Sequence, residues 1–86
     1  NYSTALEYHE KALRIREEVL SPNDPDLANT YNNIAAVCYS MGNYSAARHY
    51  YEKALHIRVK TLPPLHSKLA ITYNNIGNMY RLSGDY

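Results

Sequence analysis

The stretch TYNNI at Thr30–Ile34 occurs a second time at Thr72–Ile76, 42 residues further along the chain. The sequence on either side keeps the same period without an insertion or a deletion, so that EKAL at Glu10–Leu13 returns at Glu52–Leu55. A fixed period of this length is typical of proteins built from stacked copies of one supersecondary unit. The repeat therefore identifies equivalent positions, and each residue can be compared with its copy.

The composition is that of a small domain with almost no net charge. The 86 residues include 9 Lys and Arg and 8 Asp and Glu, which gives a formal net charge of +1 with the two signs interspersed. Such a chain does not attract nucleic acid or anionic lipid, and no apolar run reaches the roughly 18 to 20 residues that cross a bilayer. We therefore expect no nucleic-acid partner and no membrane segment. Because the single cysteine, Cys38, cannot form an internal disulfide, we expect a cytoplasmic location.

Apolar residues recur at a spacing of three and four residues in four segments, which predicts four α-helices. The segments are residues 3–20, 25–41, 45–62 and 67–83. Asp24 and Pro25 are typical of a helix start, Gly42 accepts the left-handed conformation that closes a helix, and Pro63 ends one. His66 replaces Asp24 in the second copy and predicts a weaker start for the last helix. We expect an all-α fold of antiparallel helical hairpins with short loops.

The expected core consists of repeat positions that face neighbouring helices. In residues 3–20 one stripe has the spacing of such a face, and its members are Ala5, Tyr8, His9, Ala12, Leu13, the stem of Arg16, Val19 and Leu20. Seven of the ten tyrosines are expected to pack there with their hydroxyl groups at the edge. They are Tyr8, Tyr31, Tyr44, Tyr50, Tyr51, Tyr73 and Tyr80. Tyr39 lies on the other face of its helix and is the tyrosine best placed to contact a partner.

Aromatic and small residues follow a common pattern in the two copies. The second copy reads Tyr73-x-x-Ile76-Gly77-x-x-Tyr80, and the first reads Tyr31-x-x-Ile34-Ala35-x-x-Cys38 and continues with Ala47-x-x-x-Tyr51. This pattern resembles the helix-turn-helix signature of the tetratricopeptide repeat, in which small residues lie where two helices cross closely. The common repeat has about 34 residues, and the longer period resembles the kinesin-light-chain subclass. His9 and Cys38 depart from the pattern, because each stands in place of an aromatic residue.

The resemblance implies an α-solenoid in which each unit has a first helix, A, and a second helix, B. The four helices then follow the order B, A, B, A. Residues 1–24 are helix B and the loop of a partial repeat, residues 25–66 are a complete repeat, and residues 67–86 are helix A and the turn of another partial repeat. Gly84-Asp85-Tyr86 copies the entrance to a further helix. Because both ends leave an apolar flank uncovered, we expect self-association as a homo-oligomer or a domain-swapped dimer.

Neither a catalytic site nor a metal site is expected. His9 and Glu10 match the first two residues of the His-Glu-x-x-His motif of zinc proteases, but Leu13 occupies the position of the second histidine. His49 and His56 share one helix, yet no cysteine or acid pair completes a zinc site. No glycine-rich phosphate loop is present. We therefore expect a protein that is not an enzyme and needs no cofactor.

Polar residues follow the exposed side of each helix A, which in the resembled family lines a concave groove. The candidate peptide-binding residues are Asn29, Asn32, Asn33, Ala36, Tyr39, Ser40, Ile71, Asn74, Asn75, Asn78, Arg81 and Leu82. An asparagine amide both donates and accepts hydrogen bonds, so it can hold the backbone of an extended peptide. For Asn32 and Asn74 two interpretations stay open, a groove contact or a structural hydrogen bond between helices. Arg81 would favour an acidic ligand.

The expected function is that of a protein–protein interaction scaffold of tetratricopeptide type, whose concave helix-A face binds a short peptide segment of a partner. The alternative is a self-associating structural repeat fragment, natural or designed, with no ligand of its own. Binding of RNA by a helical repeat is disfavoured by the near-neutral charge.

Overall fold

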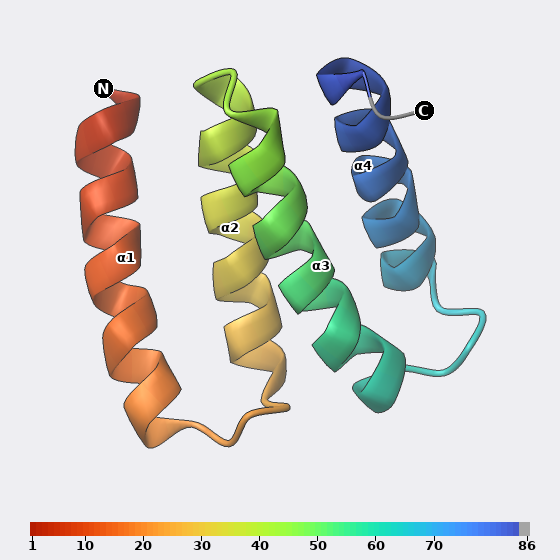
Figure 1. The fold of residues 1–86 in the computed structure, drawn as a ribbon. Helices are drawn as coiled ribbons and strands as arrows, with labels where there is room; N and C mark the ends of the chain where they lie inside the picture. Colours follow the sequence, from red (N-terminus) through yellow and green to blue (C-terminus); the bar gives the residue numbers. More distant parts are fainter. Residues whose placement is uncertain (85–86) are drawn as a thin grey trace.

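The computed structural model describes residues 1–84 and contains four α-helices and no strand in that range. They are α1 (Tyr2–Val19), α2 (Pro25–Ser40), α3 (Tyr44–Thr61) and α4 (Ser67–Ser83). Successive helices run antiparallel and lie side by side, with α1 and α4 at opposite edges of a slab of 34 × 34 × 16 Å (Figure 1). The predicted all-α fold with four helices is confirmed. No helix within residues 1–84 has the length and apolar character needed to cross a membrane. Asp85 and Tyr86, expected to enter a further helix, lie outside the described residues.

Helices α2 and α4 are capped at their N-termini by side chains at equivalent positions of the repeat. A carboxylate oxygen of Asp24 accepts a hydrogen bond from the backbone N–H of Asp26 at 2.9 Å. In the second copy the Nδ1 atom of His66 accepts from the backbone N–H of Lys68 at 3.1 Å. The expected weaker start therefore does not shorten α4, which begins at Ser67 as predicted, because a ring nitrogen of His66 supplies the acceptor that the first helical turn needs.

The turn between α2 and α3 closes around Gly42, as the sequence predicts. Gly42 has a φ angle of +80°. The N–H of Asn43 donates to the carbonyl oxygen of Cys38, and the N–H of Gly42 donates to that of Tyr39, both at 2.9 Å. These two bonds pair carbonyl groups that the end of α2 would otherwise leave unsatisfied, and they turn the chain directly into α3.

Helix α2 contributes more buried residues than any other helix because it packs between α1 and α3 (Figure 1). Its buried residues are Leu27, Ala28, Thr30, Tyr31, Ile34, Ala35 and Cys38. Helix α3 adds Ala47, Tyr51, Ala54, Ile57 and Arg58. In α1 only Leu13 is buried, and in α4 the buried residues are Leu69, Thr72 and Met79.

One polar contact joins each helix B to the following helix A, and it occurs once in each copy. The guanidinium of Arg16 donates to the hydroxyl of Thr30 at 2.6 Å, and that of Arg58 donates to the hydroxyl of Thr72 at 2.9 Å. Each threonine hydroxyl in turn donates to the carbonyl oxygen four residues earlier, at 2.9 and 2.7 Å. Because this bond uses the hydroxyl proton, its oxygen faces the arginine as an acceptor.

The expected burial of seven tyrosines is wrong for three of them. Tyr31 and Tyr51 are buried, and Tyr44 and Tyr50 are partly buried. The exposed ones are Tyr8, Tyr73 and Tyr80. The physical reason is their place at the edges of the slab, where no further helix within residues 1–84 covers them.

The same edge effect corrects two further expectations. Val19, expected in the core stripe of α1, is exposed. Gly77 was expected to be small because a helix crosses close to it, but a Cβ atom built there would meet no heavy atom within 4 Å. Its equivalent Ala35 is fully buried. Small residues at this repeat position are therefore needed in α2, where a helix lies on top of it, and not in α4 of the single chain.

Truncation of the two equivalent tyrosines should have unequal effects. Tyr31 is 8% exposed, donates its hydroxyl to Glu17 at 2.8 Å and packs on the ring of Tyr50, whereas Tyr73 is 56% exposed. We expect Tyr31→Ala to lower the free energy of unfolding by about 3–5 kcal/mol. Tyr73→Ala should change it by no more than about 0.5 kcal/mol. Urea unfolding followed by circular dichroism measures both, and equal losses would contradict the assigned burial.

Replacement of Gly42 tests the left-handed turn. No side-chain contact opposes a Cβ atom at this position, so any loss of stability in Gly42→Val reports the backbone conformation alone. We expect a loss of about 1–2 kcal/mol, because a β-branched residue is strained at positive φ. Gly77→Ala is the matched control, and it should gain up to about 1 kcal/mol from helix propensity. A Gly42→Val chain as stable as the wild type would show that the turn is misassigned.

Candidate functional site

The predicted site residues form one row on α2 and one on α4. Most of these twelve side chains are exposed, and the partly buried ones are Asn32, Asn75, Asn78 and Leu82. Helices α2 and α4 run in the same direction, so the two rows are parallel (Figure 1). None of the twelve belongs to the fully buried core. The rows therefore supply side chains that a partner can reach.

The guanidinium of Arg58 links Asn29 of the first row to helix α4. Its Nη1 atom donates to Thr72 on α4, and its Nη2 atom donates to the amide oxygen of Asn29 on α2 at 3.2 Å. Burial lowers the pKa of this guanidinium, and no carboxylate within residues 1–84 forms an ion pair with it. Asn29 thus has a structural contact besides its predicted role. The repetition of an arginine and a threonine 14 residues apart was present in the sequence and could have identified this contact.

Most of the asparagine amides in the two rows have no internal partner. Within residues 1–84, the side chains of Asn33, Asn74, Asn75 and Asn78 form no hydrogen bond. The amide oxygen of Asn32 is shielded from solvent and also lacks a donor. A shielded acceptor without a partner costs about 1–3 kcal/mol. No hydrogen bond between helices therefore uses Asn32 or Asn74 in the described part of the chain.

The positions where the two rows differ have different surroundings. The ring of Tyr39 is exposed and lies 6.0 Å from the ring of Tyr44. Arg81 is exposed and forms no ion pair within the described residues. Leu82 packs against the core, while its equivalent Ser40 is exposed. Among the positions where the rows differ, Tyr39 and Arg81 are therefore the exposed side chains that could contact a ligand selectively.

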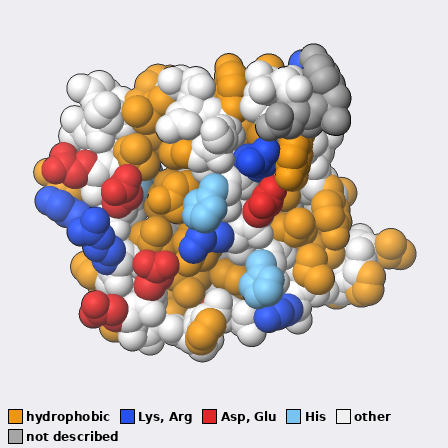
Figure 2. Space-filling model, viewed as in Figure 1, with side chains coloured by type: hydrophobic (Ala, Val, Ile, Leu, Met, Phe, Trp, Pro, Cys, Tyr) orange, Lys and Arg blue, Asp and Glu red, His pale blue; other side chains and the backbone are white. Residues whose placement is uncertain are grey.

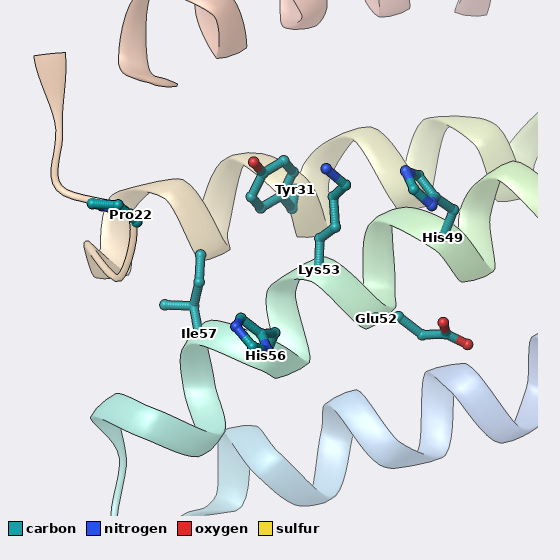
Figure 3. Close-up of a pocket in the computed structure, with 7 residues that line it drawn as sticks. All are labelled: Pro22, Tyr31, His49, Glu52, Lys53, His56 and Ile57. Carbon is teal, nitrogen blue, oxygen red and sulfur yellow. The ribbon is translucent and has the colours of Figure 1, made fainter. Parts of the chain in front are cut away.

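A hollow of about 330 Å³ opens between α2 and α3, away from these rows, and its lining residues include Tyr31, His49, Lys53 and His56 (Figure 3). The ammonium group of Lys53 lies 5.4 Å from the centre of the Tyr31 ring. Burial and the hydrogen bond to Glu17 raise the pKa of Tyr31 to about 12. Within residues 1–84 no three His, Cys, Asp or Glu side chains converge as a metal site requires.

A second hollow, of about 580 Å³, lies between α3 and α4. Its lining residues are Glu52, Leu55, His56, Val59, Lys60, Tyr73, Ile76 and Tyr80. Figure 2 shows hydrophobic side chains gathered at this edge of the molecule, over α4 and the adjoining side of α3. This apolar surface was expected in general terms as an uncovered flank, but its lining residues were not predicted.

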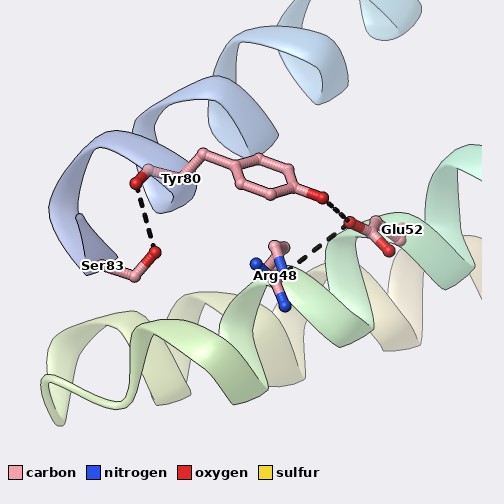
Figure 4. A network of polar contacts seen from close by, with 4 residues as sticks. All are labelled: Arg48, Glu52, Tyr80 and Ser83. Carbon is pink, nitrogen blue, oxygen red and sulfur yellow. Dashed lines mark hydrogen bonds and ion pairs between the residues drawn. The ribbon is translucent and has the colours of Figure 1, made fainter. Parts of the chain in front are cut away.

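Tyr80 is held at the rim of the second hollow by a polar network (Figure 4). Its hydroxyl donates to a carboxylate oxygen of Glu52 at 3.2 Å, and the same oxygen lies 3.8 Å from the Nε atom of Arg48. The guanidinium of Arg48 also lies 4.6 Å from the centre of the Tyr80 ring. The network exists only in the second copy, because Cys38 occupies the position equivalent to Tyr80 in the first.

Comparison with known proteins identifies one family. A family model described as tetratricopeptide repeat matches residues 1–60, which is more than half of the chain. The search of curated proteins finds no match.

The two arginines of the repeat offer a matched pair for mutation. Arg58→Ala should lower the free energy of unfolding by about 2–3 kcal/mol, because it leaves the buried acceptor of Thr72 without its charged donor. Arg16→Ala should cost about 1 kcal/mol or less, since the side chain of Arg16 is exposed and water can replace it. Chemical denaturation measures both. If Arg16→Ala were as damaging as Arg58→Ala, burial would not be what gives this contact its strength.

Proposed function

The chain belongs to the tetratricopeptide repeat family, and from this premise we propose that the parallel rows of α2 and α4 hold an extended segment of a partner protein. Membership of the family implies a scaffold for protein–protein interaction, and repeats of this family are typically non-catalytic. The 42-residue period favours the kinesin-light-chain-like subclass. The partner segment is recognised first through its backbone.

The observation that carries this proposal is the set of asparagine amides without internal partners. Each free amide offers two donors and one acceptor, which is what a peptide bond needs from a surface. Exposed amides paired with water are worth little to the fold, so their presence in both rows is not explained by stability. The backbone of a bound peptide would offer partners to the exposed amides of both rows.

The spacing of the amides fits an extended strand. Asn74 and Asn78 lie four residues apart, which is about 6 Å along the axis of α4. In an extended chain, backbone groups on one side recur every two residues, or about 6.6 Å. An extended segment lying along the helix therefore presents a peptide group near each amide in turn, as in other modes of recognition that use main-chain hydrogen bonds.

Selectivity is assigned to the places where the two rows differ. Arg81, which forms no ion pair within residues 1–84, brings a positive charge to the end of the α4 row, where a carboxylate on the ligand would form a charge-assisted hydrogen bond. Tyr39 brings an exposed aromatic ring to the equivalent place on α2. We therefore propose that the bound segment contains an acidic residue near the end that lies over Arg81.

Binding can be tested with peptides selected on the chain from a displayed library of random dodecamers. For a selected peptide, Asn74→Ala and Arg81→Ala should each weaken binding about five- to tenfold, which corresponds to about 1 kcal/mol for one hydrogen bond. Their thermal midpoints should stay unchanged, because neither side chain has an internal partner. Fluorescence polarisation gives the affinities.

Asn23→Ala is the matched control, since Asn23 is an exposed asparagine in the loop before α2 and outside both rows. It should bind the selected peptide like the wild type. A fall in thermal midpoint for Asn74→Ala that accounts for its loss of affinity would return Asn74 to a structural role. Equal weakening by Asn23→Ala would place the peptide elsewhere.

A further inference from the structure

Arg58 carries a buried positive charge for which the described part of the chain supplies no negative partner. The residue is 8% exposed. Two of the five N–H groups of its guanidinium donate to neutral oxygen atoms, on Thr72 and Asn29. The other three have no hydrogen-bond partner within residues 1–84, and no carboxylate there forms an ion pair with the group. Because a charge taken out of water needs compensating groups, the surroundings of Arg58 are electrostatically incomplete.

A small pocket of about 30 Å³ lies beside this guanidinium, between α2, α3 and α4. Its polar lining residues are Asn29, Arg58, Thr61 and Lys68, and the lining contains no Asp or Glu. Helices α2 and α4 begin at this end of the molecule, and α3 ends there (Figure 1). The lining residues come from all three helices and the loop after α3, so the walls of the pocket are formed by neighbouring elements within residues 25–68.

The two copies of the repeat carry opposite charges at this place. Lys68 is the repeat equivalent of Asp26. The backbone carbonyl oxygen of each accepts a hydrogen bond from the threonine hydroxyl that the arginine of its copy binds. Both residues therefore have the same place beside the contact between helices. The acid occurs beside exposed Arg16, whereas the base occurs beside buried Arg58, which has the greater need of a negative neighbour.

Lys68 is also unfavourably placed on its own helix. It is the second residue of α4, whose first turn contains no acidic residue, whereas the first turn of α2 contains Asp26. Because the N-terminus of a helix carries a partial positive charge, a cation in the first turn is destabilising there. The guanidinium of Arg58, the ammonium group of Lys68 and the start of α4 therefore add positive potential at one pocket, and an anion would interact favourably with all three.

We propose that this pocket binds a chloride ion between Arg58 and Lys68. The groups available to a ligand there are donors, because the amide oxygen of Asn29 already accepts from Arg58 and the hydroxyl of Thr61 donates to the carbonyl oxygen of Ile57. A volume of about 30 Å³ has room for one species of the size of water, which needs about 10–15 Å³. Chloride is close to that size, whereas sulfate and phosphate, each with four oxygen atoms around a central atom, are too large. The bound ion supplies the negative charge that the second copy lacks.

The chloride site is separate from the residues assigned to selective peptide binding. Lys68 and Arg81 lie 13 residues apart on α4, which is about 20 Å along the helix axis. Among the candidate peptide-binding residues, only Asn29 lines the pocket. Binding of chloride therefore does not depend on the proposed peptide, and the two proposals can fail separately.

The first test is the thermal midpoint at constant sodium concentration, with methanesulfonate, a bulky monovalent anion, replaced stepwise by chloride. An ion that binds only the folded chain stabilises it by mass action. Once chloride exceeds its dissociation constant, the wild-type midpoint should rise by about 5 °C or more for each tenfold increase in chloride. Sulfate at equal ionic strength should not reproduce the rise. Line broadening of the chloride nuclear resonance by the folded chain gives a second, direct measure of binding.

The second test uses Lys68→Asp, which restores the acid of the first copy. This variant should lose the chloride-dependent rise and the line broadening, and in methanesulfonate its midpoint should exceed that of the wild type, because its own carboxylate replaces the ion. Lys60→Asp is the matched control, since Lys60 is an exposed lysine that does not line the pocket, and it should keep the full dependence on chloride.

Several results would overturn the proposal. They are equal wild-type midpoints in chloride and methanesulfonate, an equal response to sulfate, full chloride dependence in Lys68→Asp, and loss of that dependence in Lys60→Asp. The last result would show that the response follows the overall charge of the chain and not the pocket beside Arg58.

Discussion

The hydrogen bond from Arg58 to Thr72 joins one repeat to the next, and much of the arrangement depends on it. The arginine is on helix B and the threonine on the following helix A, so the bond connects the two helices across their packing interface. The threonine hydroxyl cannot turn away, because its proton is already used by the carbonyl group one helical turn earlier. The same guanidinium also binds Asn29 on α2, so a single buried side chain of α3 is hydrogen-bonded to both α2 and α4. The equivalent bond from Arg16 to Thr30 shows that the contact belongs to the repeat and not to one location.

A repeat of this kind buries its apolar residues only between neighbours, and the chain shows this within itself. Helix α2, with a neighbour on each side, buries its aromatic and small residues, whereas α4 leaves the equivalent positions open at the edge. Whether a residue is buried therefore depends on the position of its helix in the stack as well as on the residue type. Within the described residues, the surface that remains open on α4 corresponds to the surface that α3 covers on α2.

Two pairs of residues that differ between the copies lie on different sides of helix A. Cys38 and Tyr80 differ on the face that packs against helix B, where Tyr80 turns toward α3 and binds Glu52. Tyr39 and Arg81 differ on the opposite, exposed side, where no packing constraint explains the change. The shared asparagines provide the same polar groups in both rows, while the differing residues give each row its own chemistry. Interaction surfaces of repeat proteins can diversify in this way without any change in the helices that support them.

The sequence by itself determined the period, the four helices, their ends at Asp24, Gly42 and Pro63, and the rows of Asn74 and its neighbours, because these follow from local backbone chemistry and from the spacing of residues along a helix. The sequence underestimated the ability of His66 to cap α4, since this role depends on a hydrogen bond between one ring nitrogen and one backbone N–H. Only the tertiary structure decided which copy of an equivalent residue is buried, so that Tyr31 is in the core and Tyr73 is not. It also decided that Asn29 binds Arg58, while the amide of Asn74 has no hydrogen-bond partner among residues 1–84. Both outcomes depend on whether another helix lies against that face, and neither the composition nor the spacing of a repeat contains that information.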